Sequence, residues 1–454
     1  MSEVMTKTSK YVKPAKEQKV FESAAVLFLF TLFVVPQYFG IRLFLFDLTL
    51  LRLMVLLITF MIFADSSRKN DFAALIWNAG FTKVMLFYLV VITYTMVLRA
   101  DINAFLNPVI EIFTFYLLIY IIKYVLGVDR VIYYLICFTY LLCVLGMVEY
   151  VMGKSPFSYL ETIEGIYTGQ FVRSGHYRIM GPGIHSLGYG LQLISIAPFI
   201  CIDLENKKVD FLMRPALLIL ISTNVLLTGS RSTLVVFSME LCLLLVFQNK
   251  VKKKELFLKI IIIFISAALL LGIFYKTSIA QYVMLQLTTM VDEIFGTAYS
   301  DYYGASKNAL SDSSDYREQL KYIFTLDWLN PILGIGRMRS FSVEMNDFYI
   351  HSIDNFYIAE YIRYAYPGLL AYIFFVGYFV CDMLKKIVKT HGAICKILLI
   401  GSVCYLINLF WMDSLQTLKY LYILFAVFWC VDDHETAKTE TITMKYIGSR
   451  YVRG

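Results

Sequence analysis

The segment YIHSIDNFYIAEYIRYAYPGLLAYIFFVGYFV, residues 349–380, changes character halfway along its length. Its second half is apolar enough to cross a bilayer, which takes about 20 predominantly apolar residues in a helix. Its first half has four polar side chains within five residues: His351, Ser352, Asp354 and Asn355. A polar cluster directly before a membrane helix predicts a chemical site at the surface of the bilayer.

The composition of the whole chain is that of a polytopic membrane protein. Of its 454 residues 59% are hydrophobic and 17% are charged, and the mean hydropathy is +0.66. A soluble domain could not bury so much apolar surface. The expected fold class is therefore all-α, with about 12 apolar segments of the length that crosses a bilayer as a helix. These segments lie near residues 21–38, 44–64, 82–99, 105–122, 130–152, 184–203, 212–229, 232–248, 257–275, 362–382, 394–412 and 415–432.

Lysine and arginine are unevenly distributed between the segments that alternate across the bilayer. With the N-terminus inside, the dense basic runs at 207–214, 250–254, 385–389 and 433–454 all face the cytoplasm. Short cytoplasmic loops are enriched in Lys and Arg, so we expect a multi-pass protein with both termini in the cytoplasm. The net charge of +7 then reflects membrane topology, and no nucleic-acid partner is expected.

This topology divides the chain into five regions. They are a basic cytoplasmic tail (1–20), transmembrane helices 1–9 (21–275), an extracytoplasmic loop (276–361), transmembrane helices 10–12 (362–432) and a cytoplasmic C-terminal tail (433–454).

The large loop between helices 9 and 10 has the pattern of a folded segment. In SIAQYVMLQLTTMVDEIF the helical period places five apolar residues on one face, which predicts a helix that lies on the membrane or packs on the bundle. These residues are Ile279, Val283, Leu287, Met290 and Ile294. A second amphipathic helix is expected after the capping residues Ser314 and Asp315, and Pro331, Gly334 and Gly336 then break the chain.

The cysteines and histidines favour neither a disulfide framework nor a metal site. None of the eight cysteines lies in the loop 276–361, and CxxC spacing is absent. His176 and His185 face outward without a carboxylate cluster beside them. We therefore expect no metal and no cofactor, and we expect these histidines to have structural or sugar-contacting roles.

Five charged side chains fall in the outer halves of predicted membrane helices. An ionisable residue at the centre of such a helix costs about 2.5–3.5 kcal/mol, so it usually faces water or has a function. Their similar depth predicts a water-filled cavity open to the outside, although each could also reach the interface by itself. The five are Asp47, Arg52, Glu111, Arg231 and Lys419.

Three motifs in a fixed order carry a resemblance to a known family. They are TGSRSTLV at 228–235, SDYREQLKYIFTLDWLNPILGIG at 314–336 and HSIDNFYIAEYIRYAYPGLLAYI at 351–373. This order resembles the O-antigen polymerase and O-antigen ligase superfamily of bacterial envelope glycosyltransferases. The upstream YRIMGPGIHSLGYG, at 177–190, is similar to the segment with which that family enters a membrane helix.

The resemblance implies a GT-C-like fold in the bacterial cytoplasmic membrane, working on undecaprenyl-pyrophosphate-linked oligosaccharides. Arg231 and Arg317 match the family's two essential arginines, which hold the donor pyrophosphate, and His351 matches its acceptor-activating histidine. Where many members have His-Asn, this chain has His-Ser, so the partner of His351 is open. Substrate contacts are expected from Arg178, His185, Ser230, Asp354, Asn355 and Arg337.

The chemistry of such a transfer needs these residue types. The leaving group is already activated as a lipid pyrophosphate, so the enzyme must stabilise its negative charge and deprotonate the incoming hydroxyl. Arginine provides permanent charge and histidine titrates near neutral pH. Aromatic side chains of the outer loop could in addition stack on sugars, although more than half of them are expected to pack. They include Tyr302, Tyr303, Tyr349, Phe356 and Tyr357.

The first functional hypothesis is a polymerase that joins lipid-linked repeat units of O-antigen, capsule or exopolysaccharide. The second is a ligase that passes the finished polymer to a lipid A core. A third, from another class, is a transporter of lipid-linked oligosaccharides, but the internal repeats common in transporters are not seen. A flippase and a chain-length regulator are the protein partners to expect, and the motifs do not separate polymerase from ligase.

Overall fold

A computed structural model describes residues 15–43, 46–167, 172–173, 175–204, 208–247, 253–304, 315–345, 348–390, 392–413 and 418–431. The predicted C-terminal tail, most of the predicted N-terminal tail and the capping residue Ser314 lie outside these ranges. The described chain is mostly helical, with four two-stranded antiparallel hairpins. The expected all-α class is confirmed.

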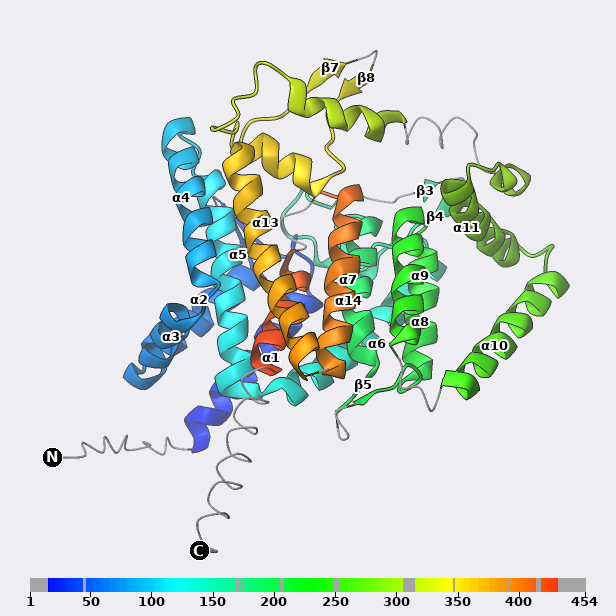
Figure 1. Cartoon of the computed structure of the whole chain (residues 1–454), viewed down its shortest axis with the longest axis horizontal. Helices are drawn as coiled ribbons and strands as arrows, with labels where there is room; N and C mark the ends of the chain where they lie inside the picture. Colours follow the sequence, from blue (N-terminus) through cyan, green and yellow to red (C-terminus); the bar gives the residue numbers. More distant parts are fainter. Residues whose placement is uncertain are drawn as a thin grey trace, which may run out of the picture.

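Most of the helices pack into one bundle, whereas α10 stands apart at its side (Figure 1). The first half of the chain contributes α1 (Ala15–Phe33), β1 (Gly40–Arg42), β2 (Asp47–Thr49), α2 (Leu50–Phe63), α3 (Ser66–Asn78), α4 (Thr82–Arg99), α5 (Asn103–Tyr120) with the π-helical η1 (Ile121–Leu126), α6 (Val128–Met152) and η2 (Pro156–Leu160). Then follow β3 (Val172–Arg173), β4 (His176–Tyr177), α7 (Ser186–Ile200), β5 (Ile202–Asp203), β6 (Lys208–Val209), α8 (Pro215–Leu227), α9 (Arg231–Val246), α10 (Lys253–Ile273) and α11 (Ser278–Phe295).

The last third of the chain contains the segments nearest the polar cluster. They are η4 (Tyr299–Tyr303), η5 (Leu320–Thr325), β7 (Val343–Met345), β8 (Phe348–Ile350), α13 (Phe356–Thr390), α14 (Ala393–Asn408), η6 (Leu409–Trp411) and a final apolar helix Leu418–Val431.

Five of the described helices are long and apolar enough to cross a membrane, or six if the bent pair α2 and α3 is one span. Further apolar helices, such as α7, α8 and Leu418–Val431, are shorter. The multi-pass class is therefore supported, whereas the expected count of twelve spans is not confirmed. One expected span, 44–64, is shorter than its apolar run because β2 forms a hairpin with β1 and Thr49 caps α2, so the helix begins only at Leu50.

The segment 349–380 contains the start of α13. Asn355 caps the helix, since its Oδ1 accepts a hydrogen bond from the Ile358 amide at 3.1 Å. The helix is interrupted at Ala365, whose φ of 56° and ψ of −163° are not helical. Its first turns lie across the end of the bundle, and the remainder runs down between the other helices (Figure 1). The helix thus starts before the predicted span 362–382 and changes direction inside it.

The segment between α10 and α13 is folded and packs on the bundle. The predicted helix over 279–294 is present as α11, but its most buried face carries Tyr282, Leu285 and Thr289, whereas Val283 is only half-buried and Ile294 is exposed. The face of α11 that packs on the bundle is therefore not the predicted apolar face, and the other expected position of that face, on the membrane, stays a prediction.

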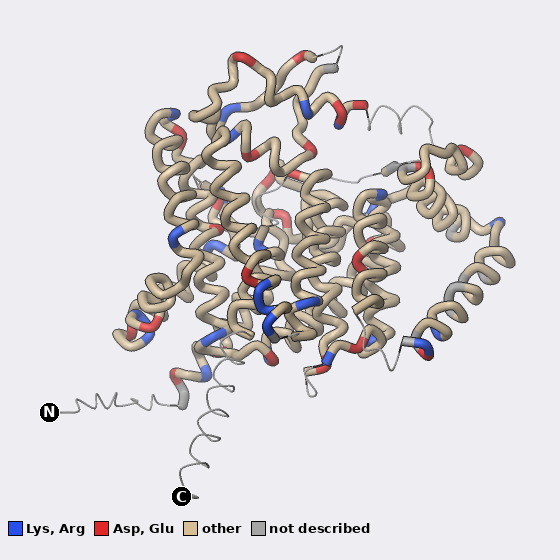
Figure 2. The backbone as a smooth tube through the Cα atoms, viewed as in Figure 1, with Lys and Arg blue, Asp and Glu red and all other residues tan. Residues whose placement is uncertain are grey.

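A small separate core attaches η5 and the β7–β8 hairpin to the start of α13. It contains Leu320, Ile323, Leu329, Ile350, Ile358, Tyr361 and Ile362. Figure 1 shows this part of the chain lying over one end of the helices. Lys and Arg gather at the opposite end of the bundle (Figure 2), the distribution that the positive-inside rule describes.

Candidate active site

The turn NPILGIG, residues 330–336, docks on the interruption of α13. The Ile335 amide donates to the carbonyl of Ile362 at 2.9 Å, and the Gly336 amide donates to that of Arg363 at 3.1 Å. In a continuous helix the Arg363 carbonyl would accept from residue 367, which is a proline without an N–H. The turn therefore satisfies carbonyl groups that the interruption leaves free.

Gly334 has to be a glycine for this docking. A Cβ at this position would overlap the carbonyl group of Arg363 and the amide nitrogen of Tyr364. From the other side, Arg99 donates to the carbonyls of Gly334, at 2.7 Å, and Leu333, at 3.1 Å. The glycines that the sequence analysis took as chain breakers thus let the loop backbone touch the backbone of α13.

The Arg337 side chain is held inside the protein. Its Nε donates to the Tyr364 hydroxyl at 2.8 Å, and one terminal nitrogen lies 2.7 Å from a carboxylate oxygen of Glu360. Its own amide and that of Met338 donate to Asp101, at 2.5 and 2.8 Å. The guanidinium therefore has protein partners, and direct substrate binding by Arg337 stays a prediction.

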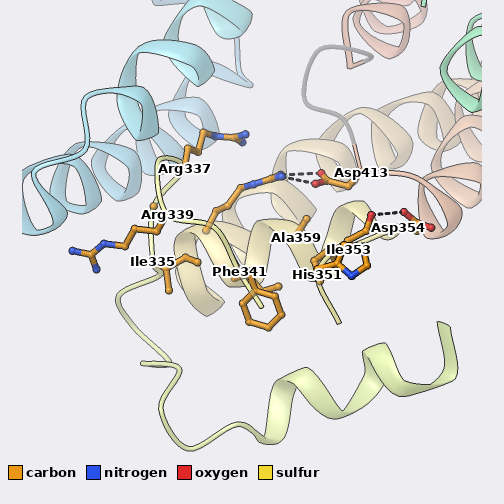
Figure 3. Close-up of a pocket in the computed structure, with 13 residues that line it drawn as sticks. Ile335, Arg337, Arg339, Phe341, His351, Ile353, Asp354, Ala359 and Asp413 are labelled. Carbon is orange, nitrogen blue, oxygen red and sulfur yellow. Dashed lines mark hydrogen bonds and ion pairs between the residues drawn. The ribbon is translucent and has the colours of Figure 1, made fainter. Parts of the chain in front are cut away.

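A pocket of about 320 Å³ lies between this turn, the polar cluster and α13 (Figure 3). Of the residues predicted for the site, His351, Asp354 and Arg337 line it. Three further charged residues, which were not predicted from the sequence, line the pocket: Arg339, Arg363 and Asp413.

Arg363 and Asp413 pair across the pocket through both carboxylate oxygens, one of them 2.8 Å from Arg363. Charged residues within a membrane helix are usually functional. Glu360 and Arg363, three residues apart at the start of an apolar segment, were therefore the signal that could have revealed this part of the site. Asp413 lies beyond η6 in the sequence, and only folding brings it here.

His351 presents its ring at the pocket. Its Nδ1 lies 3.4 Å from the carbonyl oxygen of Tyr349, and the two rings are stacked with centroids 5.8 Å apart. The Asp354 carboxylate accepts from the Ser352 hydroxyl at 3.0 Å. The His351 ring nitrogen is therefore next to a main-chain carbonyl. Asp354 holds the turn that carries His351 through its hydrogen bond with Ser352.

Arg317 lies beside this segment without lining the pocket. The hydroxyl of its neighbour Tyr316 donates to the Ser352 carbonyl at 2.6 Å and accepts from the Ser352 amide at 3.1 Å. The Nε of Arg317 is buried and has no hydrogen-bond partner among the residues that the structure describes. Arg317 is thus on an element tied directly to the His351 turn, and its contact with a pyrophosphate stays a prediction.

The GSR turn forms the N-terminus of α9. Gly229 has a φ of 58°, a left-handed conformation that favours glycine. The Ser230 side chain caps the helix by accepting from the Thr233 amide, and Arg231, the first helical residue, is buried. Since the N-terminus of a helix attracts anions, the turn presents a favourable dipole together with a guanidinium.

A second arginine reaches the same turn from the segment 177–190. Arg178 donates from its Nε to the carbonyl of Thr228 at 2.8 Å, and a Cβ on Gly229 would lie 3.0 Å from its Cγ. The predicted site residues Arg178, Ser230 and Arg231 are therefore brought together, although they lie far apart in the sequence.

Glu149, at the end of α6, holds the segment that carries Arg178. The buried carboxylate accepts from the amides of Met180 and Gly181, at 2.7 and 3.0 Å, and from the Tyr177 hydroxyl at 2.9 Å. We missed this residue because it falls near the end of a predicted apolar span. It acts as a positioning residue for Arg178.

His185 caps α7, with its Nδ1 accepting from the Leu187 amide at 3.2 Å. It does not line the pocket beside α13, and its contact with substrate stays a prediction.

Arg52, one of the five charged residues expected around an outer cavity, has hydrogen-bond partners inside the protein. It donates to the Asn107 side chain at 2.7 Å and to the Asp47 carbonyl at 2.6 Å. None of the five lines the pocket beside α13, and a water-filled cavity around them stays a prediction.

No group of three or more His, Cys, Asp or Glu residues that could hold a metal ion occurs in the described ranges. The positive charge at the pocket comes from the arginine side chains Arg337, Arg339 and Arg363.

Comparison with known families supports the resemblance drawn from the motifs. Residues 216–379 match a family model described as O-Antigen ligase. The matched part runs from α8 into α13 and includes the GSR turn, Arg317, the NPILGIG turn and His351. A comparison with curated proteins found no match. The matched family implies a glycosyltransferase-like or ligase activity in envelope glycan synthesis, and the match over residues 216–379 supports the resemblance of this membrane protein to the O-antigen polymerase and ligase superfamily.

Proposed function

We propose that the protein is a polymerase that joins undecaprenyl-pyrophosphate-linked oligosaccharide repeats at the outer face of the bacterial cytoplasmic membrane. The observation that carries this proposal is the gathering of two arginines at one helix N-terminus. Arg178 reaches the turn that begins α9, where Arg231 is the first helical residue, and a separate pocket beside α13 contains His351 and Asp354.

The two arginines suit the leaving group. As the bond between the anomeric carbon and the pyrophosphate oxygen breaks, negative charge develops on the lipid pyrophosphate. Two guanidinium groups and a helix N-terminus stabilise that charge, and they are in place before the reaction begins. Arg317 adds a third guanidinium if the loop brings it to the same headgroup.

The pocket suits the acceptor. A sugar hydroxyl placed beside His351 attacks the anomeric carbon, and the ring nitrogen of His351 takes up the hydroxyl proton. The proton thus moves to His351, the new glycosidic bond forms, and the lipid pyrophosphate leaves. No redox step or further co-reactant is needed.

Reconstitution tests this function and separates it from the alternatives. The purified protein in liposomes, given lipid-linked repeats extracted from the host, should produce a ladder of longer glycans on a gel. A ligase would transfer glycan only when a lipid A core acceptor is added, and a transporter would move the substrate across the vesicle without lengthening it. Either of those patterns would refute the polymerase.

The topology proposed with this function is a GT-C-like bundle of about 12 spans, with both termini in the cytoplasm and residues 276–361 outside. Tyr302 is 86% exposed in that loop, and Lys19 is exposed near the N-terminus. A Tyr302→Cys variant should react with a membrane-impermeant maleimide in intact cells, measured against the parent chain. A Lys19→Cys variant should react only after permeabilisation, and the reverse pattern would overturn this orientation.

A further inference from the structure

Two pairs of stacked rings stand at the pocket. Phe341 stacks on Trp328, with centroids 5.7 Å apart and planes 24° apart, and His351 stacks on Tyr349 at 5.8 Å and 22°. Phe341 and His351 line the pocket, whereas their partners Trp328 and Tyr349, the outer rings, do not. The outer rings are open to solvent, since Trp328 is 55% exposed and Tyr349 is 62% exposed.

The β7–β8 hairpin places these pairs close to each other. Phe341 precedes β7, and Tyr349 and His351 lie in and just after β8. Val343 and Ile350 form the last pair of the hairpin. The residues just before Val343 and just after Ile350 therefore leave the hairpin next to each other, toward the pocket. Figure 3 shows Phe341 and His351 on neighbouring segments of the pocket.

The backbone under the outer rings is anchored. Leu329 follows Trp328 and is 6% exposed, and Ile350 follows Tyr349 and is fully buried in the small core described above. Because the neighbouring residue is buried, the backbone under each exposed ring is fixed and the ring keeps its orientation. A ligand that stacks on the ring therefore costs little conformational entropy for ordering the site.

The pocket is too small for the whole of an oligosaccharide substrate. Its volume of about 320 Å³ is at the lower end of the roughly 300–1,000 Å³ typical of ligand sites. A saccharide whose end occupies the pocket must therefore continue outside, and the two stacked pairs mark surfaces on which it can lie.

The surroundings of the rings favour a carbohydrate over a lipid surface. Sugar rings offer flat C–H faces to an aromatic ring and hydroxyl groups to polar neighbours at its rim. The exposed charged residues Lys321, Asp327, Arg339 and Glu344 belong to the same part of the chain. Inserting these charges into hydrocarbon is costly, whereas they can hydrogen-bond to hydroxyl groups in water.

We propose that Trp328 and Tyr349, together with Phe341 and His351, form an aromatic cleft that binds the saccharide chain where it leaves the pocket. This inference rests on the proposed function insofar as the ligand is the enzyme's own glycan. The outer rings bind sugar residues beyond the one that reacts, so their contribution grows with the length of the saccharide.

Binding of glycan fragments of defined length tests the cleft. The probes are fragments of one, two and four repeat units, released by partial acid hydrolysis of the host's surface polysaccharide. The full-length protein in nanodiscs is titrated and Kd is measured by calorimetry. Trp328→Ala and Tyr349→Ala should each weaken binding of the four-unit fragment about tenfold, equivalent to about 1.4 kcal/mol, and binding of the one-unit fragment far less.

Two further variants make the result specific. Trp328→Phe keeps an aromatic face and should retain most of the affinity for long fragments. Trp77→Ala removes another exposed tryptophan, on α3 and 83% exposed, and should bind all fragments like the parent protein. A general folding defect would instead weaken all lengths equally.

Equal affinity of Trp328→Ala and the parent for all lengths would overturn the cleft, as would no binding of any fragment by the parent. So would quenching of Trp328 fluorescence by brominated phospholipids in the nanodisc, which would place this ring in the membrane. Failure of the proposed function gives a different result: no polymer in the reconstituted assay, with length-dependent fragment binding retained.

Discussion

His351→Ala is expected to stop chain growth while the protein still binds its lipid-linked donor. The ring lines the pocket, and the contact recorded for its Nδ1 is a carbonyl oxygen 3.4 Å away. Loss of a general base typically costs about 10²–10⁴-fold in rate. The effect should appear as missing long glycan on a gel and as a fall in kcat rather than in donor affinity, because donor binding rests on the arginines.

The control for this variant is Ile332→Ala, which changes a side chain 67% exposed on the same loop and should leave chain lengths unchanged. Both proteins must be present in the membrane at the level of the parent. Wild-type chain lengths from His351→Ala would show that His351 is not the base. Asp354→Asn would then be tested next, since Asp354 lines the same pocket.

Arg231→Lys is expected to reduce polymerisation severely although it keeps the positive charge. Lysine presents one ammonium group in place of the planar fork that binds two phosphate oxygens at once. Loss of a preorganised group that stabilises developing negative charge costs about 10²–10³-fold. Initial rates of glycan formation, measured against donor concentration, should show this loss, and the same result is expected for Arg317→Lys.

Arg130→Lys is the matched control, because Arg130 is 61% exposed and pairs with Glu22 on the surface. Lysine can replace arginine in an exposed ion pair, which contributes little, so the rate should not change. If Arg231→Lys polymerises at the parent rate, the GSR turn does not hold the pyrophosphate. If Arg317→Lys polymerises at the parent rate and Arg231→Lys does not, then Arg317 stabilises the loop and does not bind the pyrophosphate.

The amino-acid sequence by itself determined the class of the protein and the positions of its chemistry. Apolar length and basic loops depend on local composition, so the membrane class and α11 could be read directly, whereas the start of α13 at Phe356 lies before the span 362–382 that its apolar residues predict. The GSR turn, the glycine turn and His351 were found because each is a short contiguous motif. The side of α11 that packs on the bundle could not be read in this way, since buried Thr289 and Asp292 look polar to any hydropathy scale.

Only the tertiary structure decided how these motifs meet. Arg363 finds Asp413, Arg178 finds the carbonyl of Thr228, and the glycine turn docks on α13. These contacts join residues 27 to 50 positions apart in the sequence, and the docking takes place where α13 changes direction at Ala365. The membrane class depends on the average composition of each segment, which can be read along the chain. A hydrogen bond instead needs two particular atoms within bonding distance, and the packing of the helices decides which atoms these are.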